Sequence, residues 1–150
     1  MESLATELDR IIDQGRPALE SINKNKLVEK RLPGKWSKKE IIGHMIDSAQ
    51  SNIRRFVVAQ YEDIPLITYN QDKWVASNNY QQWDDKELIT LWYLLNRQIA
   101  QILRNMAEGV SERQCQTEAL HSIEWLAEDY IKHLRHHLQQ VLEGEPVPYP

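Results

Sequence analysis

Apolar residues recur at helical spacing in the segment 84–107, and no other feature restricts the possible folds of this chain so strongly. They stand three or four residues apart, at Leu88, Trp92, Leu95, Ile99, Ile102 and Met106. This spacing places them on one face of an α-helix that packs against others in a left-handed bundle. Asp84 and Glu87 are typical of a helix N-terminus, and Gly109 follows the last apolar position. The segment therefore predicts a core helix.

Three further segments show the same periodicity, and we predict core helices at 3–25, 37–60 and 122–142. Ser37 and Glu40 form a capping-box pattern, and Ser122 is a second candidate N-cap. Gly15 and Pro17 predict a kink or a break in the first helix. The segment 61–83 is a long connection, 111–121 is polar and loop-like, and the tail 144–150 cannot continue a helix. No segment has the alternation of a strand, so we expect an all-α fold.

Composition limits the classes of protein that this chain can belong to. Its 150 residues, 41% of them hydrophobic, suit one domain spanning 1–150. The net charge of −4 leaves no basic surplus for phosphate backbones, so we expect no nucleic-acid partner. No apolar run reaches membrane length, and the acidic N-terminus does not resemble a signal peptide. Because Cys115 is the single cysteine, no intrachain disulfide can form. We expect a cytoplasmic protein that does not act at a membrane.

Histidines supply the candidate chemistry. His133 and His137 stand four residues apart, which places both imidazoles on one helical face, at the edge of its apolar side, where they can share a metal ion. His136 points away from the core on the same helix. The third ligand must come from elsewhere, and His44, in another helical segment, is the obvious candidate. His121 precedes a helix cap and reads as a loop residue. The alternative interpretation is that these are surface histidines of an ordinary amphipathic helix.

Three other polar residues could assist such a site. Asp47 follows His44 by three residues and could accept an imidazole N–H, as metal-bound histidines usually require. Arg55 lies in the polar stripe of the same helix, and Asp129 precedes His133 by four residues. Each is equally compatible with an exposed surface position.

Several segments recur in a recognisable order along nearly the whole chain. They are 34–37 (GKWS), 40–44 (EIIGH), 52–56 (NIRRF), 69–75 (YNQDKWV) and 125–138 (WLAEDYIKHLRHHL). Together they resemble the DinB-like superfamily, which is related to thiol-dependent S-transferases. The resemblance implies a four-helix bundle in up-down-down-up order, with a long crossover between the second and third helices. It also implies a divalent metal held by His44, His133 and His137.

The resemblance further implies an activity. Three histidines leave a coordination position open, as in catalytic rather than structural zinc sites. Relatives use such a centre with a low-molecular-weight thiol, so a thiol-dependent S-transferase acting on a small molecule is the first expectation. A metal-dependent hydrolase is the nearer alternative, and a non-catalytic metal-binding bundle or interaction module is another. Zinc is the first choice, and nickel, iron or manganese would also suit nitrogen ligands. Such proteins often pair, so we expect a homodimer.

Overall fold

The computed structural model describes residues 1–145 and 149, and within these residues the chain is mostly helical. Its elements, in chain order, are α1 (Glu2–Glu20), α2 (Lys24–Val28), α3 (Lys38–Val58), α4 (Gln71–Asn78), the 3-10 helix η1 (Tyr80–Gln82), α5 (Asp85–Arg104), the 3-10 helix η2 (Val110–Glu112), β1 (Gln114–Gln116), β2 (Leu120–Ser122) and α6 (Ile123–Leu142). The expectation that the tail 144–150 does not continue a helix falls partly outside the described residues, at positions 146–148 and 150.

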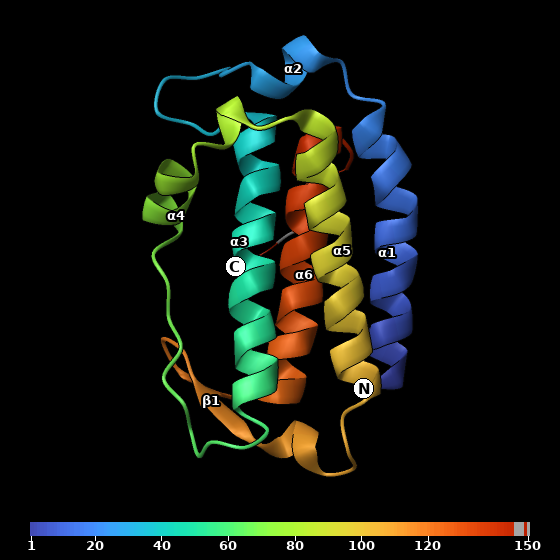
Figure 1. Ribbon diagram of the computed structural model, residues 1–150, viewed down its shortest axis with the longest axis vertical. Coiled ribbons are helices and arrows are strands. Elements are labelled where there is room, and N and C mark those ends of the chain that lie inside the picture. The colour runs from blue at the N-terminus through green and yellow to red at the C-terminus, as the bar shows by residue number, and fades with distance from the viewer. Residues whose placement is uncertain (146–148, 150) are drawn as a thin grey trace.

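The four long helices form a bundle in up-down-down-up order. In Figure 1, α1 and α6 run upward, whereas α3 and α5 run downward. Because α3 and α5 point the same way, the chain between them must return along the length of the bundle. This crossover carries α4 and η1 and passes along the outer side of α3 (Figure 1). The predicted fold class and the long crossover are both confirmed.

Local sequence signals account for the starts of the long helices. The Ser37 hydroxyl accepts from the Glu40 amide, and the Glu40 carboxylate accepts from the Ser37 amide. Asp84 caps α5, and Ser122 caps α6 by accepting from the Trp125 amide. Each of these side chains satisfies amides that have no partner within the helix. The predicted boundaries of these three helices therefore agree with the structure to within three residues.

The first predicted helix, 3–25, needs two corrections. It does not break at Gly15 or Pro17, because α1 is continuous from Glu2 to Glu20. Proline removes one donor from the ladder, and packing of the buried face of α1 against α5 and α6 compensates for that loss. The helix also ends earlier than predicted. The side chain of Asn23 caps a separate short helix, α2, by accepting from the Asn25 amide.

The structure contains a small strand pair that no sequence pattern indicated. β1 and β2 form a small antiparallel hairpin in which Cys115 pairs with His121. Leu66, in the crossover, forms a parallel bridge to Gln116 of β1. Strands of three residues are too short to show an alternating pattern, so only tertiary pairing reveals them. The hairpin matters for function because it ties the crossover to the end of the bundle beside α6 (Figure 1).

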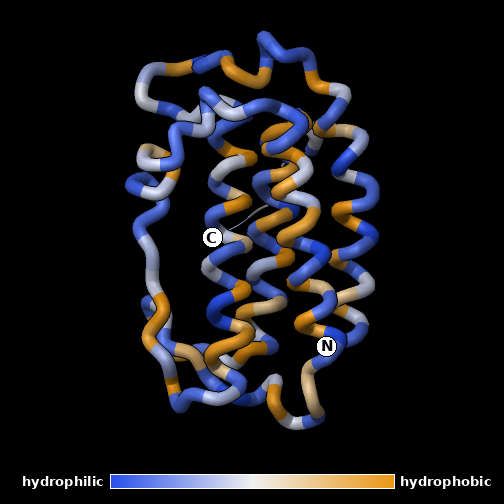
Figure 2. The backbone as a smooth tube through the Cα atoms, viewed as in Figure 1, coloured by the Kyte–Doolittle hydropathy of each residue, from blue (hydrophilic) through white to orange (hydrophobic). Residues whose placement is uncertain are grey.

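The core lies between the long helices, as the periodicity predicts. Figure 2 shows apolar residues returning at helical intervals along each of them. Leu88, Trp92 and Ile99 of α5 are at most 1% exposed, and they face α1 and α3. Among the described residues, no helix is long and apolar enough to cross a membrane.

Gly43 of α3 permits an unusually close approach of the crossover. A Cβ atom at this position would lie 2.0 Å from Tyr80 Cδ2, and Tyr80 is only 1% exposed. Helix propensity alone would make Gly43→Ala stabilising by about 1 kcal/mol. We expect instead a loss of about 1–3 kcal/mol in the free energy of unfolding, because the Tyr80 ring cannot move without disturbing the core. Urea denaturation measures this free energy, and Gln50→Ala, at an exposed position of α3, is the control. A more stable Gly43→Ala variant would contradict the packing.

Candidate metal centre

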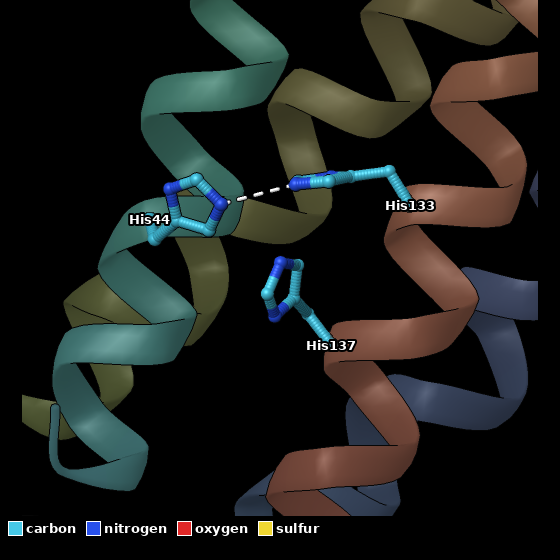
Figure 3. A group of neighbouring side chains, drawn as sticks. All are labelled: His44, His133 and His137. Carbon is cyan, nitrogen blue, oxygen red and sulfur yellow. Dashed lines mark hydrogen bonds between the residues drawn. The ribbon is translucent and has the colours of Figure 1, made fainter. Parts of the chain in front are cut away.

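Three histidines from two helices meet beside the core. His44 projects from α3, and His133 and His137 project from successive turns of α6, so that the three rings face one another (Figure 3). The Nε2 atoms of His44 and His133 lie 3.0 Å apart. The ring centres of His137 lie 4.7 Å from His44 and 4.5 Å from His133. The structure thus brings together the three residues that the sequence selected.

Burial and mutual repulsion keep these imidazoles neutral. The pKa of His44 is lowered to about 3, mainly by burial and in smaller part by the proximity of His137. Burial, followed by the neighbouring histidines, also holds the pKa of His133 well below 6.5. The pKa of His137 is lowered mainly by burial. Only neutral imidazoles can donate an electron pair to a cation, so the site favours the form that binds metal.

Two polar residues outside the cluster orient its rings. Ser48 Oγ lies 3.5 Å from His133 Nδ1, and Gln140 Oε1 lies 3.0 Å from His137 Nδ1. Each oxygen can accept a hydrogen bond from Nδ1–H, which favours the tautomer whose Nε2 is unprotonated and able to bind a metal. Gln140 follows His137 by three residues, and this helical spacing was the sequence signal that could have identified it. His44 Nδ1 is buried and has no hydrogen-bond partner among the described residues.

The nitrogen atoms are close enough for a divalent ion. One ligand nitrogen of each histidine lies within 4.8 Å of the others. Ligands at 2.0–2.1 Å from a tetrahedral ion stand about 3.3 Å apart, so small rotations of the rings would complete the geometry. The neutral charge state, the two Nδ1 acceptors and the spacing all fit a metal with nitrogen ligands. These features do not select one metal among zinc, nickel, iron and manganese.

The predicted hydrogen bond from a histidine to Asp47 does not form. Asp47 is fully buried, and its Oδ1 accepts from the Tyr80 hydroxyl and from Asn78 Nδ2. Its position on α3 turns it toward α4 and η1, away from the cluster. Burial raises the pKa of Asp47 to about 6, although the hydrogen bond from Tyr80 opposes the rise. Asp47 therefore ties the crossover to α3.

Because of this raised pKa, we expect Asp47→Asn to increase the free energy of unfolding by an amount that depends on pH. The unfolded carboxyl ionises near 3.8 and the folded one only near 6, so the wild type loses stability as pH rises between these values. The variant lacks this loss. Its free energy of unfolding relative to wild type should rise by up to about 3 kcal/mol from pH 4 to pH 7.

Urea titrations at several pH values measure the difference. Asp72→Asn makes the same chemical change at an exposed position and serves as the control. Parallel pH profiles for wild type and Asp47→Asn would contradict the raised pKa.

A cavity of about 890 Å³ opens beside the histidines. Its wall includes His133 and His137 of the cluster, residues 68–72 of the crossover, and the hairpin segment 117–119. The predicted helpers Arg55 and Asp129 both line it, whereas Asp47 does not. This size lies within the range of small-molecule binding sites. The cluster therefore stands at the wall of a space that can hold a substrate.

The two remaining histidines also line this cavity without joining the cluster. His136 is half-buried, and its ring centre lies 4.9 Å from that of His137. His121 lies in β2 rather than in a loop, and its ring stacks on Trp125 at 3.6 Å. Trp36, whose ring centre lies 5.0 Å from that of His44, lines the same cavity. Sequence reasoning did not assign Trp36 or Trp125 to the site.

The fold and the site define the class: an up-down-down-up helical bundle with a three-histidine cluster at a cavity. The chain belongs to the DinB superfamily, whose sequence profile matches residues 7–141. It is 22% identical over 137 residues to a Bacillus licheniformis protein named as a candidate metal-dependent hydrolase, covering 84% of this chain and 78% of that protein.

Among solved structures, YfiT from Bacillus subtilis has the same fold, with a TM-score of 0.83 and 20% sequence identity. The match covers 94% of this chain and 83% of YfiT. YfiT is described as a candidate metal-dependent hydrolase with an unusual four-helix bundle topology. That description agrees with the helix order seen here.

Proposed function

We propose that this protein is a metal-dependent enzyme that transfers a group of a small molecule to a low-molecular-weight thiol. The observation that carries the proposal is the cluster of three neutral imidazoles, two of which, His133 and His137, line the cavity. His44, His133 and His137 would hold a divalent ion, with zinc as the first choice, and leave a coordination position for a further ligand. Such an ion lowers the pKa of a bound water or thiol and polarises an electrophile.

The chain's own residues would then position the reactants. Ser48 and Gln140 hold the rings of His133 and His137 in the orientation that binds metal. Asp129 lines the cavity one helical turn before His133, and its Oδ2 accepts from the Tyr149 hydroxyl. Its carboxylate can take up the proton that the nucleophile loses. Trp36 and Trp125 add apolar surface to the wall of the cavity.

Hydrolysis is the second candidate, since both similar proteins are named as candidate metal-dependent hydrolases. The nucleophile would then be water instead of a thiol, with the same residues in the same roles. The volume of the cavity favours transfer, because about 890 Å³ is enough for a thiol and a second small molecule together.

Turnover by the zinc-loaded protein separates these functions. We expect consumption of 2-mercaptoethanol with monochlorobimane at more than about 100 times the rate seen with metal-free protein, a barrier reduction of about 3 kcal/mol. Release of nitrophenol from nitrophenyl acetate without thiol reports hydrolysis. Zinc-dependent melting without turnover of either probe would favour a non-catalytic bundle. The His133→Ala variant controls for reaction away from the site.

A further inference from the structure

Arg55 of α3 places a cationic group in the cavity beside the histidine cluster. The residue is partly buried and lines the same cavity as His133 and His137. Its Nε donates to the Ile67 carbonyl at 3.2 Å, and its Nη1 donates to Asn52 Oδ1 at 3.4 Å. These bonds use two of the five N–H donors of the guanidinium, so the others remain available to a ligand.

No carboxylate lies within ion-pair distance of this guanidinium in the described part of the chain. The ion pairs there involve Arg16, Lys30, Arg31, Lys38, Lys39, Arg97, Arg104, Arg113 and Arg135. Asp129 lines the same cavity and its charge raises the pKa of Arg55, but it stands beyond ion-pair distance, and its Oδ2 accepts from the Tyr149 hydroxyl. Burial lowers the pKa of Arg55, which reflects the cost of removing its charge from water. An anion bound in direct contact with the guanidinium would offset this cost.

A chain of hydrogen-bonding groups connects Arg55 to the cluster. Asn52 donates through Nδ2 to the Ser48 carbonyl at 2.9 Å, which turns its Oδ1 toward Arg55. Ser48 in turn lies beside His133. Asn52 is one helical turn beyond Ser48, about 6 Å along the axis. A group bound by Arg55 would therefore stand about 6–10 Å from the reacting centre, a span that one small molecule can cover.

The charges around the cavity indicate which anion fits. Arg55 is the one lysine or arginine among the described lining residues, whereas Asp72, Glu118 and Asp129 are acidic. A single negative charge suits one guanidinium among several carboxylates better than a dianionic phosphate does. The planar fork of arginine also matches the two oxygens of a carboxylate. We propose that Arg55, positioned by Asn52, anchors a carboxylate of the small molecule that reacts at the three histidines. This inference rests on the proposed function.

Binding to the metal-free protein tests the anchor independently of any activity. Calorimetric titration with phenylacetate and with its neutral analogue phenylacetamide isolates the effect of the charge. We expect phenylacetate to bind at least about tenfold more tightly to wild type. Arg55→Gln should bring the two affinities to within about twofold. Benzylphosphonate binding more tightly than phenylacetate would overturn the choice of a singly charged group.

Arg54→Gln is the matched control, because it removes the same charge from the neighbouring, exposed position. It should keep the full preference for phenylacetate. Arg55→Lys keeps the charge but loses the planar guanidinium, so it should keep part of the preference for phenylacetate. This variant replaces Arg55→Gln in the test if Arg55→Gln does not fold. A purely structural Arg55 would lower the melting temperature without changing the ratio of the two affinities. Equal binding of both compounds by wild type, or no binding of phenylacetate, would refute the anchor.

A cobalt-loaded protein shows which reactant carries the carboxylate. Titration with 3-mercaptopropionate and 3-mercaptopropanamide, followed by the thiolate-to-cobalt absorption band, compares a charged and a neutral thiol. An Arg55-dependent preference for the charged thiol assigns the carboxylate to the thiol. A preference seen only with phenylacetate assigns it to the second reactant. Absence of the band with either thiol would count against the proposed function, while the phenylacetate result would still decide the anchor.

Discussion

Replacement of His44, His133 or His137 by alanine is expected to abolish stoichiometric metal binding. Each residue supplies one of three nitrogen atoms that lie within 4.8 Å of one another, and two nitrogens cannot hold an ion as three do. We expect each substitution to weaken affinity by more than about 100-fold, beyond the 10–100-fold typical of residues that only orient ligands. Equilibrium dialysis followed by elemental analysis measures the metal content and the affinity.

His136→Ala and His121→Ala are the matched controls and should keep most of the metal. His136 is adjacent to His137 in sequence but lies outside the cluster, and His121 stacks on Trp125. Ser48→Ala and Gln140→Ala should give intermediate losses, since these residues orient His133 and His137. Loss of the ion in His136→Ala together with its retention in His137→Ala would show that the helical face is assigned wrongly. If none of the three alanine variants lost metal, the ion would bind elsewhere.

Zinc is expected to raise the melting temperature of the wild type by roughly 5–10 °C at a concentration 100 times its dissociation constant. The three ligands come from α3 and α6, which are far apart in the sequence, so the ion binds the folded bundle and not the unfolded chain. Thermal denaturation with and without zinc measures the increment. The His44→Ala variant should lose it, and an increment of equal size in that variant would contradict the site.

The pH dependence of this increment follows from the lowered histidine pKa values. Free histidines lose metal as they protonate near pH 6.5, and the sequence alone suggests that range. Burial lowers the pKa of all three residues, that of His44 to about 3, so protons compete less well in the folded protein. The zinc increment should therefore persist below pH 6.5. The metal-free protein should lose stability as pH falls below 6.5, because the histidines then take up protons only when the chain unfolds.

Interactions between residues close in the sequence allowed the long helices and part of the histidine cluster to be predicted. The spacing of Leu88, Trp92 and Ile99, and the caps at Ser37 and Ser122, depend on interactions within one helical turn or on one helical face. The pairing of His133 with His137 is equally local, because helix geometry places residues four apart on the same side. These features need no knowledge of the rest of the chain, so the helices and two of the three histidines of the cluster were predictable.

The tertiary structure alone decided what lies opposite each helix. The contact between His44 and His133, 89 residues apart, exists because the crossover lets α3 pack beside α6. The same packing turned Asp47 toward Tyr80, brought Ser48 beside the ring of His133, and allowed the hairpin of β1 and β2 to line one side of the cavity. Contacts between distant segments depend on how whole helices pack, and the periodicity of one segment does not identify the helix that packs against it.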